Sequence, residues 1–317
     1  MIYGRDGWRY LLVGFLKKDA YNHIDKRSHV TIAEGNTDAA LAYLEGKTES
    51  DPMAMARRVD YQYFGDVLAF DATYKKNKYR RPLVIFSGAN NHKQTTIFGF
   101  CLLMDETFDS YKWILQNMEV MCMKEPSVVV TDGHEAMRKA ITLVFPKATY
   151  RLCAWHFQKN IMANVKEPSL RLRFNRWLYA DIDIREFLTE WDLAIEEFKL
   201  QDSLWARQVF DKKEMWVNAY LRNKFCAEFR TTSQCEGINA VVKNFLQLKR
   251  TILELVQNLK LMVRDYRNNE LLAQFRTIDT FLLMTTSLDA IERFVALTYT
   301  KEVFANSHPY TIKNYVN

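Results

Sequence analysis

Short apolar runs alternate with longer amphipathic segments through the first half of the chain. The short runs are rich in β-branched and aromatic residues and are bounded by charged or turn residues, which is the pattern of buried strands. In the longer segments apolar residues recur at a spacing of three and four, which predicts helices. The predicted strands and helices are Val67–Phe70, Pro82–Ser87 and Thr95–Leu103 (strands), Thr107–Met121 (helix), Ser127–Thr131 (strand), His134–Phe145 (helix) and a short strand near Tyr150–Ala154.

The order of these elements predicts a topology. Short connections favour an antiparallel meander for the first three strands, and helical crossovers favour parallel pairing for the later ones. This is the ribonuclease-H-like arrangement. We therefore predict an α/β fold with a ribonuclease-H-like core over residues 61–160.

The following stretch, residues 161–230, predicts a large all-helical insertion. Its apolar residues between Phe187 and Phe198 fall at helical spacing, behind a capping box formed by Asp183 and Glu186. The other predicted regions are a helical N-terminal flank over residues 1–60, a catalytic-helix and helical C-terminal part over 231–305, and a divergent tail over 306–317.

Composition narrows the functional classes. With 317 residues, 48% of them hydrophobic, the chain can bury one large or two ordinary cores. A formal charge of +6, from 44 Lys and Arg against 38 Asp and Glu, is compatible with a polyanionic partner. Five cysteines without a C-x-x-C spacing predict reduced thiols in an intracellular protein. We recognise no leader and no run of 18 apolar residues, so we expect neither secretion nor membrane insertion.

Three carboxylates carry the most specific chemical signal. Asp71 and Asp132 each end an apolar run, and Glu236 opens a predicted helix. If the two strands are neighbours, about 4.7–4.9 Å apart, their terminal carboxylates can share metal ions. A glutamate from a crossing helix would complete a site for two Mg²⁺ or Mn²⁺ ions roughly 3.5–4 Å apart, which is the arrangement that cuts phosphodiesters.

Two of the three acids also have a structural interpretation. Asp132 with Glu135, and Ser233 with Glu236, both match the capping box of a helix. For either acid taken alone, capping is the better interpretation, whereas three such acids in this fold order favour a site. Asp71 has no comparable alternative, because a carboxylate at a buried strand end is costly unless it is paired or bound to a metal.

Two further features remain open. Cys153 and His156 have the spacing of half a zinc site, but no second pair with suitable spacing is visible, so we expect Cys153 to be a core residue. A basic stretch between the first two strands is either a solvated hairpin tip or a contact to the DNA backbone. Its residues are Lys75, Lys76, Lys78, Arg80 and Arg81.

Several strings resemble a known family, the transposase domain of Mutator-like elements, and in finer detail the plant FAR-RED IMPAIRED RESPONSE-related proteins. The similar strings are Phe64–Tyr74, Thr131–Ile141, Leu152–Asn160 and Thr231–Lys243, within a resemblance running from about Asp19 to Phe304. The resemblance implies a ribonuclease-H-like core interrupted by a helical insertion before the catalytic glutamate. It also places His156 near the site, as a phosphate contact or proton carrier.

The resemblance implies function as well. The members of this family are nuclear, DNA-binding regulators of light-responsive transcription. For this chain the resemblance therefore implies homo- or heterodimers and no membrane association. Family members also carry a zinc-dependent DNA-binding module and a zinc finger, and neither is recognisable in these 317 residues. The chain departs from the family between Ala56 and Tyr61, where a stretch is missing, and after Phe304.

Two hypotheses follow. The first is a domesticated transposase, in which the core serves as a scaffold and dimerisation surface in transcription. The second is an active nuclease and strand transferase at terminal inverted repeats, in which Asp71, Asp132 and Glu236 hold the metal ions.

Overall fold

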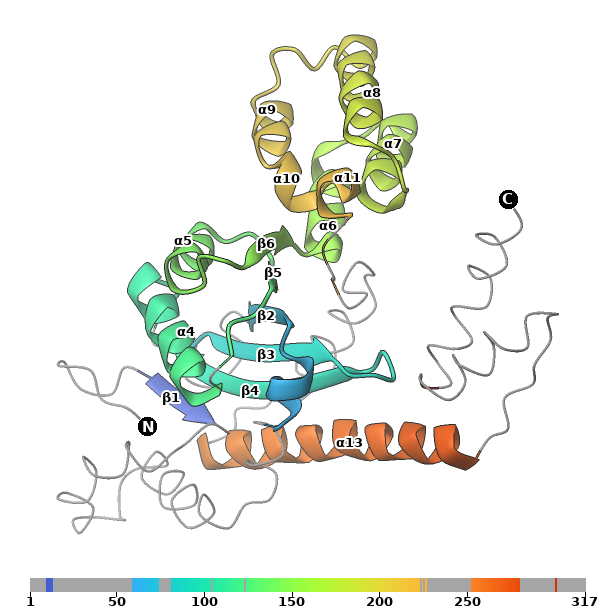
Figure 1. The fold of residues 1–317 in the computed structure, drawn as a ribbon. Coiled ribbons are helices and arrows are strands. Elements are labelled where there is room, and N and C mark those ends of the chain that lie inside the picture. The colour runs from blue at the N-terminus through green and yellow to red at the C-terminus, as the bar shows by residue number, and fades with distance from the viewer. Residues whose placement is uncertain are drawn as a thin grey trace.

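The computed structural model is a mixed α/β structure in which one sheet is flanked by helices (Figure 1). It describes residues 10–13, 59–73, 81–103, 105–122, 124–222, 224, 226, 252–279 and 300. Some residues singled out in the sequence lie outside these ranges, and their predicted roles stay predictions. They are Lys75, Lys76, Lys78, Arg80 and Glu236.

Five strands from the middle of the chain form an open sheet, and a sixth strand joins one edge. The strand order is β1-β4-β3-β2-β5-β6. β1 to β4 pair antiparallel, whereas β2, β5 and β6 run parallel to one another. The strands span Tyr10–Val13 (β1), Val67–Thr73 (β2), Leu83–Ala89 (β3), Thr95–Leu103 (β4), Val128–Thr131 (β5) and Thr149–Leu152 (β6).

The two helices between the parallel strands cover one face of the sheet. They are α4 (Phe108–Cys122) and α5 (Glu135–Val144), which pack against each other. Because side chains alternate across a strand, Leu68 and Phe70 of β2 point into the core beneath these helices. Val67 and Ala69 point to the opposite face, where they meet Val130 of β5. This alternation decides on which face later residues of the same strands lie.

A group of helices follows β6 and has its own aromatic core (Figure 1). Trp216 is fully buried at its centre, stacks on Phe157 with ring centroids 4.5 Å apart, and donates a 2.9 Å hydrogen bond to the carbonyl of Val209. The helices are α6 (Ala154–Asn164), α7 (Pro168–Tyr179), α8 (Ile184–Glu197), α9 (Leu204–Asp211), α10 (Lys213–Trp216) and α11 (Asn218–Leu221).

The described residues between 161 and 222 form helices, as the spacing of apolar residues predicts. The carboxylate of Asp183 accepts a 2.8 Å hydrogen bond from the backbone N–H of Glu186, so Asp183 caps α8 as the sequence predicts. The other half of the predicted capping box is replaced by an ion pair, because Glu186 contacts Arg176 of α7.

A long helix near the C-terminus, α13 (Ile252–Asp279), packs against β4 (Figure 1). Arg267 in this helix donates hydrogen bonds of 2.9 Å to both carboxylate oxygens of Asp60, which lies in a short helix over residues 59–64. Asp60 is buried, so this ion pair joins two segments that are 207 residues apart in the chain. The described part of α13 agrees with the helical character expected for this region.

The N-terminal flank differs from its prediction at Tyr10–Val13, which is a strand rather than part of a helix. Tyr10 and Val13 are β-formers, and the edge of β4 offers the four residues backbone partners from Phe100 to Leu103. The long-range pairing therefore overrides the helical expectation here. Strand β2 also extends three residues beyond the apolar run, because β3 pairs with it as far as Thr73.

Replacement of Trp216 by alanine tests the helical core. Removing a fully buried indole leaves a cavity, so Trp216→Ala should lower the free energy of unfolding by about 3–5 kcal/mol. Leu172 in α7 is 70% exposed, and Leu172→Ala should change it by no more than about 0.5 kcal/mol. Urea unfolding followed by far-UV circular dichroism measures both, and equal midpoints for the two variants would refute this packing.

Candidate active site

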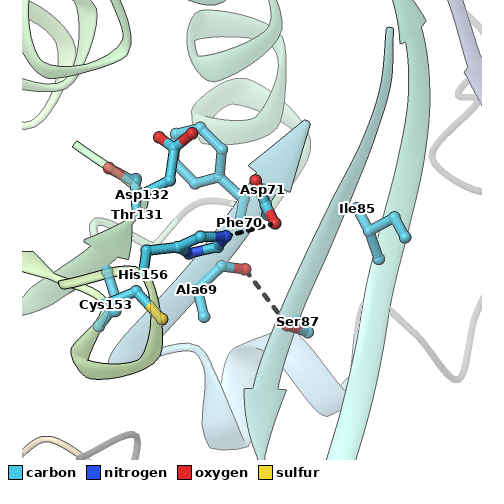
Figure 2. Close-up of a pocket in the computed structure, with 10 residues that line it drawn as sticks. Ala69, Phe70, Asp71, Ile85, Ser87, Thr131, Asp132, Cys153 and His156 are labelled. Atoms are coloured by element: carbon cyan, nitrogen blue, oxygen red, sulfur yellow. Dashed lines mark hydrogen bonds and ion pairs between the residues drawn. The ribbon is translucent and has the colours of Figure 1, made fainter. Parts of the chain in front are cut away.

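Parallel pairing of β2 with β5 brings Asp71 and Asp132 together. The strands pair with Val67 beside Val128 and Ala69 beside Val130. Continuing this register by two residues places Asp71 beside Asp132, which directly follows β5. Both acids also share the face of Val67, Ala69 and Val130, since side chains alternate along each strand. The two predicted strand-end acids therefore lie side by side at one edge of the sheet (Figure 2).

The turn after Asp132 depends on a glycine. Gly133 has a φ of +97°, in the left-handed region that L side chains rarely adopt, and an added Cβ would come within 2.7 Å of Leu152. Across this turn, the backbone N–H of His134 donates a 3.0 Å hydrogen bond to Asp132 Oδ1. The turn thus directs the Asp132 carboxylate to the sheet edge before α5 begins.

The capping-box interpretation of Asp132 is not what the structure shows. The N-cap of α5 is His134, two residues later, and Glu135 pairs with Arg138 through hydrogen bonds of 2.6 and 3.0 Å. The reason is that the tight turn at Gly133 separates Asp132 from the helix. Asp132 is exposed and available to a ligand.

His156 lies against the acids from the first turn of α6. Its Nε2 atom is 3.6 Å from Oδ2 of Asp71, and both side chains line one pocket with Asp132 and Cys153 (Figure 2). Cys153 is the buried N-cap residue of α6, as expected of a core cysteine. The partial positive charge at the helix start falls on the same region and favours negative groups there.

The electrostatics of His156 follow from these neighbours. Burial on its own lowers the pKa of His156. Hydrogen bonding with Cys153 and the negative charges of Asp71 and Asp132 outweigh burial, so the pKa is raised above its ordinary value of 6.5. The imidazole can therefore hold a proton next to the acids, or pair with a phosphate.

Burial and the charges of the acids raise the pKa of two tyrosines, which the sequence alone did not single out for this role. Burial raises the pKa of Tyr111 in α4, and the charges of Glu106, Asp132 and Asp71 add to the rise. The Tyr111 hydroxyl donates a 3.3 Å hydrogen bond to Glu106. Burial also raises the pKa of Tyr150 to about 12, and this hydroxyl shares a 2.7 Å hydrogen bond with Thr131. Both phenols therefore remain protonated, and the hydroxyl of Tyr150 contacts the end of β5, directly before Asp132.

The donor set suits a hard cation but is incomplete within the described residues. Two adjacent carboxylates are the oxygen ligands that Mg²⁺ and Mn²⁺ prefer. Among the described residues, however, no group of three His, Cys, Asp or Glu side chains could hold a metal ion. Glu236, the predicted third ligand, lies outside the described residues, so its place in the site stays a prediction. Arg81, the described member of the basic stretch, is half-buried before β3.

The candidate site has two acids on neighbouring parallel strands and a histidine against them. These residues lie within a stretch that matches a known domain family. Residues 67–160 match the MULE transposase domain, a stretch that begins with β2 and contains Asp71, Asp132 and His156. This part of the chain is therefore similar to the transposase domain of the MULE class. Within the described residues, no helix is both long and apolar enough to cross a membrane.

Comparison with curated proteins confirms the predicted resemblance over most of the chain. Three proteins of Arabidopsis thaliana are similar: FAR1-RELATED SEQUENCE 5, with 26% identity over 92% of this chain, FAR1-RELATED SEQUENCE 4, with 25% over 89%, and FAR-RED IMPAIRED RESPONSE 1, with 24% over 91%. The matches cover 40%, 42% and 38% of those proteins. The chain thus spans about two-fifths of the length of these relatives.

Replacement of Asp71 by asparagine tests the pairing with His156. Removing the carboxylate charge withdraws support from the imidazolium, so Asp71→Asn should lower the pKa of His156. The readout is an NMR titration of the imidazole in the presence of a chelator. Asp109→Asn, which removes an exposed acid in α4, serves as the control and should leave that pKa unchanged.

The pH dependence of the free energy of unfolding is a second readout of the raised His156 pKa. Since the folded-state pKa of His156 is raised, its protonation stabilises the fold below the unfolded pKa of about 6.5. This contribution disappears as the pH rises through the folded pKa. A His156 pKa that is identical in the parent and Asp71→Asn would show that the two side chains are not paired in solution.

Proposed function

We propose that this chain is the transposase-derived part of a nuclear, DNA-associated protein that acts in regulation of transcription. The observation that carries the proposal is the adjacency of Asp71 and Asp132 inside the stretch that matches the MULE transposase domain. A domain of transposase origin had phosphodiesters as its ligand, and two adjacent carboxylates are of use for such a ligand chiefly through metal ions.

The strand order supports a ribonuclease-H-like core. That topology requires three antiparallel strands followed by two parallel ones. The sheet has this arrangement, with β4-β3-β2 antiparallel and β5 and β6 parallel to β2. Under this proposal helices α7 to α11 belong to an insertion between the core and the helix that carries Glu236. The aromatic core around Trp216, separate from the core of the sheet, supports the division.

The proposed metal ligands are Asp71, Asp132 and Glu236. Bound Mg²⁺ or Mn²⁺ would supply charge neutralisation of a phosphate and activation of a water molecule. The residues of the chain have their own tasks. Asp132 is oriented by its hydrogen bond from the His134 N–H, and His156 stands against Asp71, where it can hold a proton or contact a phosphate oxygen.

DNA is the proposed partner, with the phosphate backbone as the first contact. The proposed backbone contacts are Lys75, Lys76, Lys78, Arg80 and Arg81, in the connection between β2 and β3. Phosphate contacts carry no base information and weaken as salt rises, so this binding should show little sequence preference. Sequence recognition would then fall to zinc modules of the kind expected in the family.

Regulation of transcription is proposed from the relatives. A protein named FAR-RED IMPAIRED RESPONSE 1 and two proteins named FAR1-RELATED SEQUENCE are similar over most of this chain. By this likeness we propose a nuclear regulator of the light-response type that forms homo- or heterodimers with related proteins. The core would serve there as a scaffold and dimerisation surface.

A second candidate function is metal-dependent cleavage and strand transfer at terminal inverted repeats. The observation in its favour is that Asp71 and Asp132 are both carboxylates in matching register, with His156 beside them. A chain that had lost all selection for chemistry would be free to replace either acid. The two functions differ in whether the DNA strand is also held in line for attack, which chemistry requires beyond the ligands.

Incubation with inverted-repeat DNA in Mg²⁺ or Mn²⁺ separates the two functions. We expect this chain to bind the DNA weakly and to show little or no cleavage. A net charge of +6 over 317 residues attracts the phosphate backbone only weakly, so the strand is not held in line for attack. Nicking is measured on supercoiled plasmid. The matched variants Asp71→Asn and Glu236→Gln control for contaminating nucleases.

Two results would overturn the proposal in different ways. Robust nicking by the parent chain that both variants abolish would establish the enzyme and reject the non-cleaving scaffold. Absence of binding to any DNA, at low salt and with either metal, would reject DNA association itself.

A further inference from the structure

A second cleft opens beside the acids and extends away from the sheet. Asp132 and His156 line both this cleft and the pocket that contains Asp71, so the two spaces are neighbours. The opposite wall comes from Trp205 and Gln208 of α9 and from Lys212, the C-cap residue of that helix. The cleft therefore lies between the sheet edge and the helical group.

The lining combines three kinds of surface. Leu152, Phe157 and Val209 provide an apolar side. Asn160 and Gln208 are exposed and present amide groups. Lys212 is exposed and provides a positive charge. An apolar surface with convergent amides and one cation matches a nucleotide, which joins a flat base and a sugar to one negative phosphate.

The aromatic wall is fixed in place. The indole N–H of Trp205 donates a 2.8 Å hydrogen bond to Asn160 Oδ1, and its ring lies against Phe174 with centroids 5.6 Å apart. Trp205 is only half-buried, so part of the indole remains at the cleft. A rigid, partly exposed aromatic side chain is the surface on which bases pack in proteins that bind single strands.

The positive charge of Lys212 is not neutralised by a close ion pair within the described part of the chain. No carboxylate among the described residues forms an ion pair with Lys212 at close range. Its charge contributes to lowering the pKa of Glu135, after the larger effect of the hydrogen bond from Arg138. Lys212 is the C-cap residue of α9 and the N-cap residue of α10, so it stands at the junction of the two helices. The charge is thus held at the cleft and available to a phosphate.

The size of the cleft and its aromatic wall favour a single strand. Its volume is about 240 Å³, below the roughly 300–1,000 Å³ of pockets that enclose drug-sized ligands. A space of this order suits a group about the size of one nucleotide, and the bases of a single strand are free to stack on an aromatic side chain. A duplex would have to expose a base before that base could pack on Trp205.

We propose that the cleft between Asp132 and Lys212 binds one nucleotide of an unpaired DNA strand, adjacent to the phosphate that the acids face. This inference rests on the proposed function, and it names the form of the DNA that the site takes. Lys212 contacts the phosphate, Trp205 and the apolar side contact the base or sugar, and the amides of Asn160 and Gln208 contact polar edges.

Fluorescence anisotropy with a labelled single-stranded oligonucleotide, and with the same sequence as a duplex, tests the proposal on the full chain. The first variant is Lys212→Glu. Its control is Lys147→Glu, the same charge change at an exposed lysine just before β6, at the opposite end of that strand from the cleft. The second variant is Gln208→Glu, with Gln116→Glu in α4 as its control. Circular dichroism establishes that each variant is folded.

We expect Lys212→Glu and Gln208→Glu to weaken single-strand binding about tenfold more than their controls. Lys212→Glu should also reduce the slope of log affinity against log salt by about 0.7, the value for one lost phosphate contact on a single strand. Duplex binding should change no more in these variants than in the controls.

Equal losses in Lys212→Glu and Lys147→Glu, or equal losses on duplex and single strand, would overturn the cleft assignment while leaving DNA association intact. A parent chain that binds neither form of DNA would instead reject the proposed function on which the inference rests. The two failures are therefore distinguishable in one set of titrations.

Discussion

The parallel pairing of β2 with β5 is the constraint on which the candidate site depends. Its register places Val67 beside Val128, and the alternation of side chains then fixes on which face each later residue lies. A shift of the pairing by one residue would move one of the two acids to the face covered by α4 and α5. The buried side chains of Leu68 and Phe70 oppose such a shift, because they would leave that core.

Negative charge at this edge is balanced by what surrounds it. His156 lies 3.6 Å from Asp71, the start of α6 faces the pocket, and the Gly133 turn supplies a backbone N–H to Asp132. These groups reduce the repulsion between two carboxylates without removing their capacity to bind a cation. The helical group after β6 then supplies the far wall of a cleft, so that a strand leaving the acids would meet Trp205 and Lys212.

The sequence predicted the parts of this arrangement that local pattern controls. The runs of β-formers located β2 to β6, the spacing of apolar residues located the helices, and the turn residues located Asp132 at a strand end. Long-range contacts were beyond the pattern. The strand at Tyr10–Val13 exists through pairing with β4, and the cleft exists because α9 packs back toward the sheet edge. Nothing in the local sequence around Lys212 indicates that its partner across the cleft is Asp132. The convergence of Glu236 with the two acids stays a prediction.

Binding of Mn²⁺, followed by electron paramagnetic resonance, tests most directly whether the two acids form a cation site. We expect the parent chain to bind the ion, and both Asp71→Asn and Asp132→Asn to weaken binding by at least about tenfold, since each removes one charged oxygen ligand. The variant Asp109→Asn should bind as the parent does, because that acid lies in the first turn of α4 and lines neither space beside the acids. Unchanged affinity in both Asp71→Asn and Asp132→Asn would contradict the account, because the adjacency of the acids would then have no role in binding a cation.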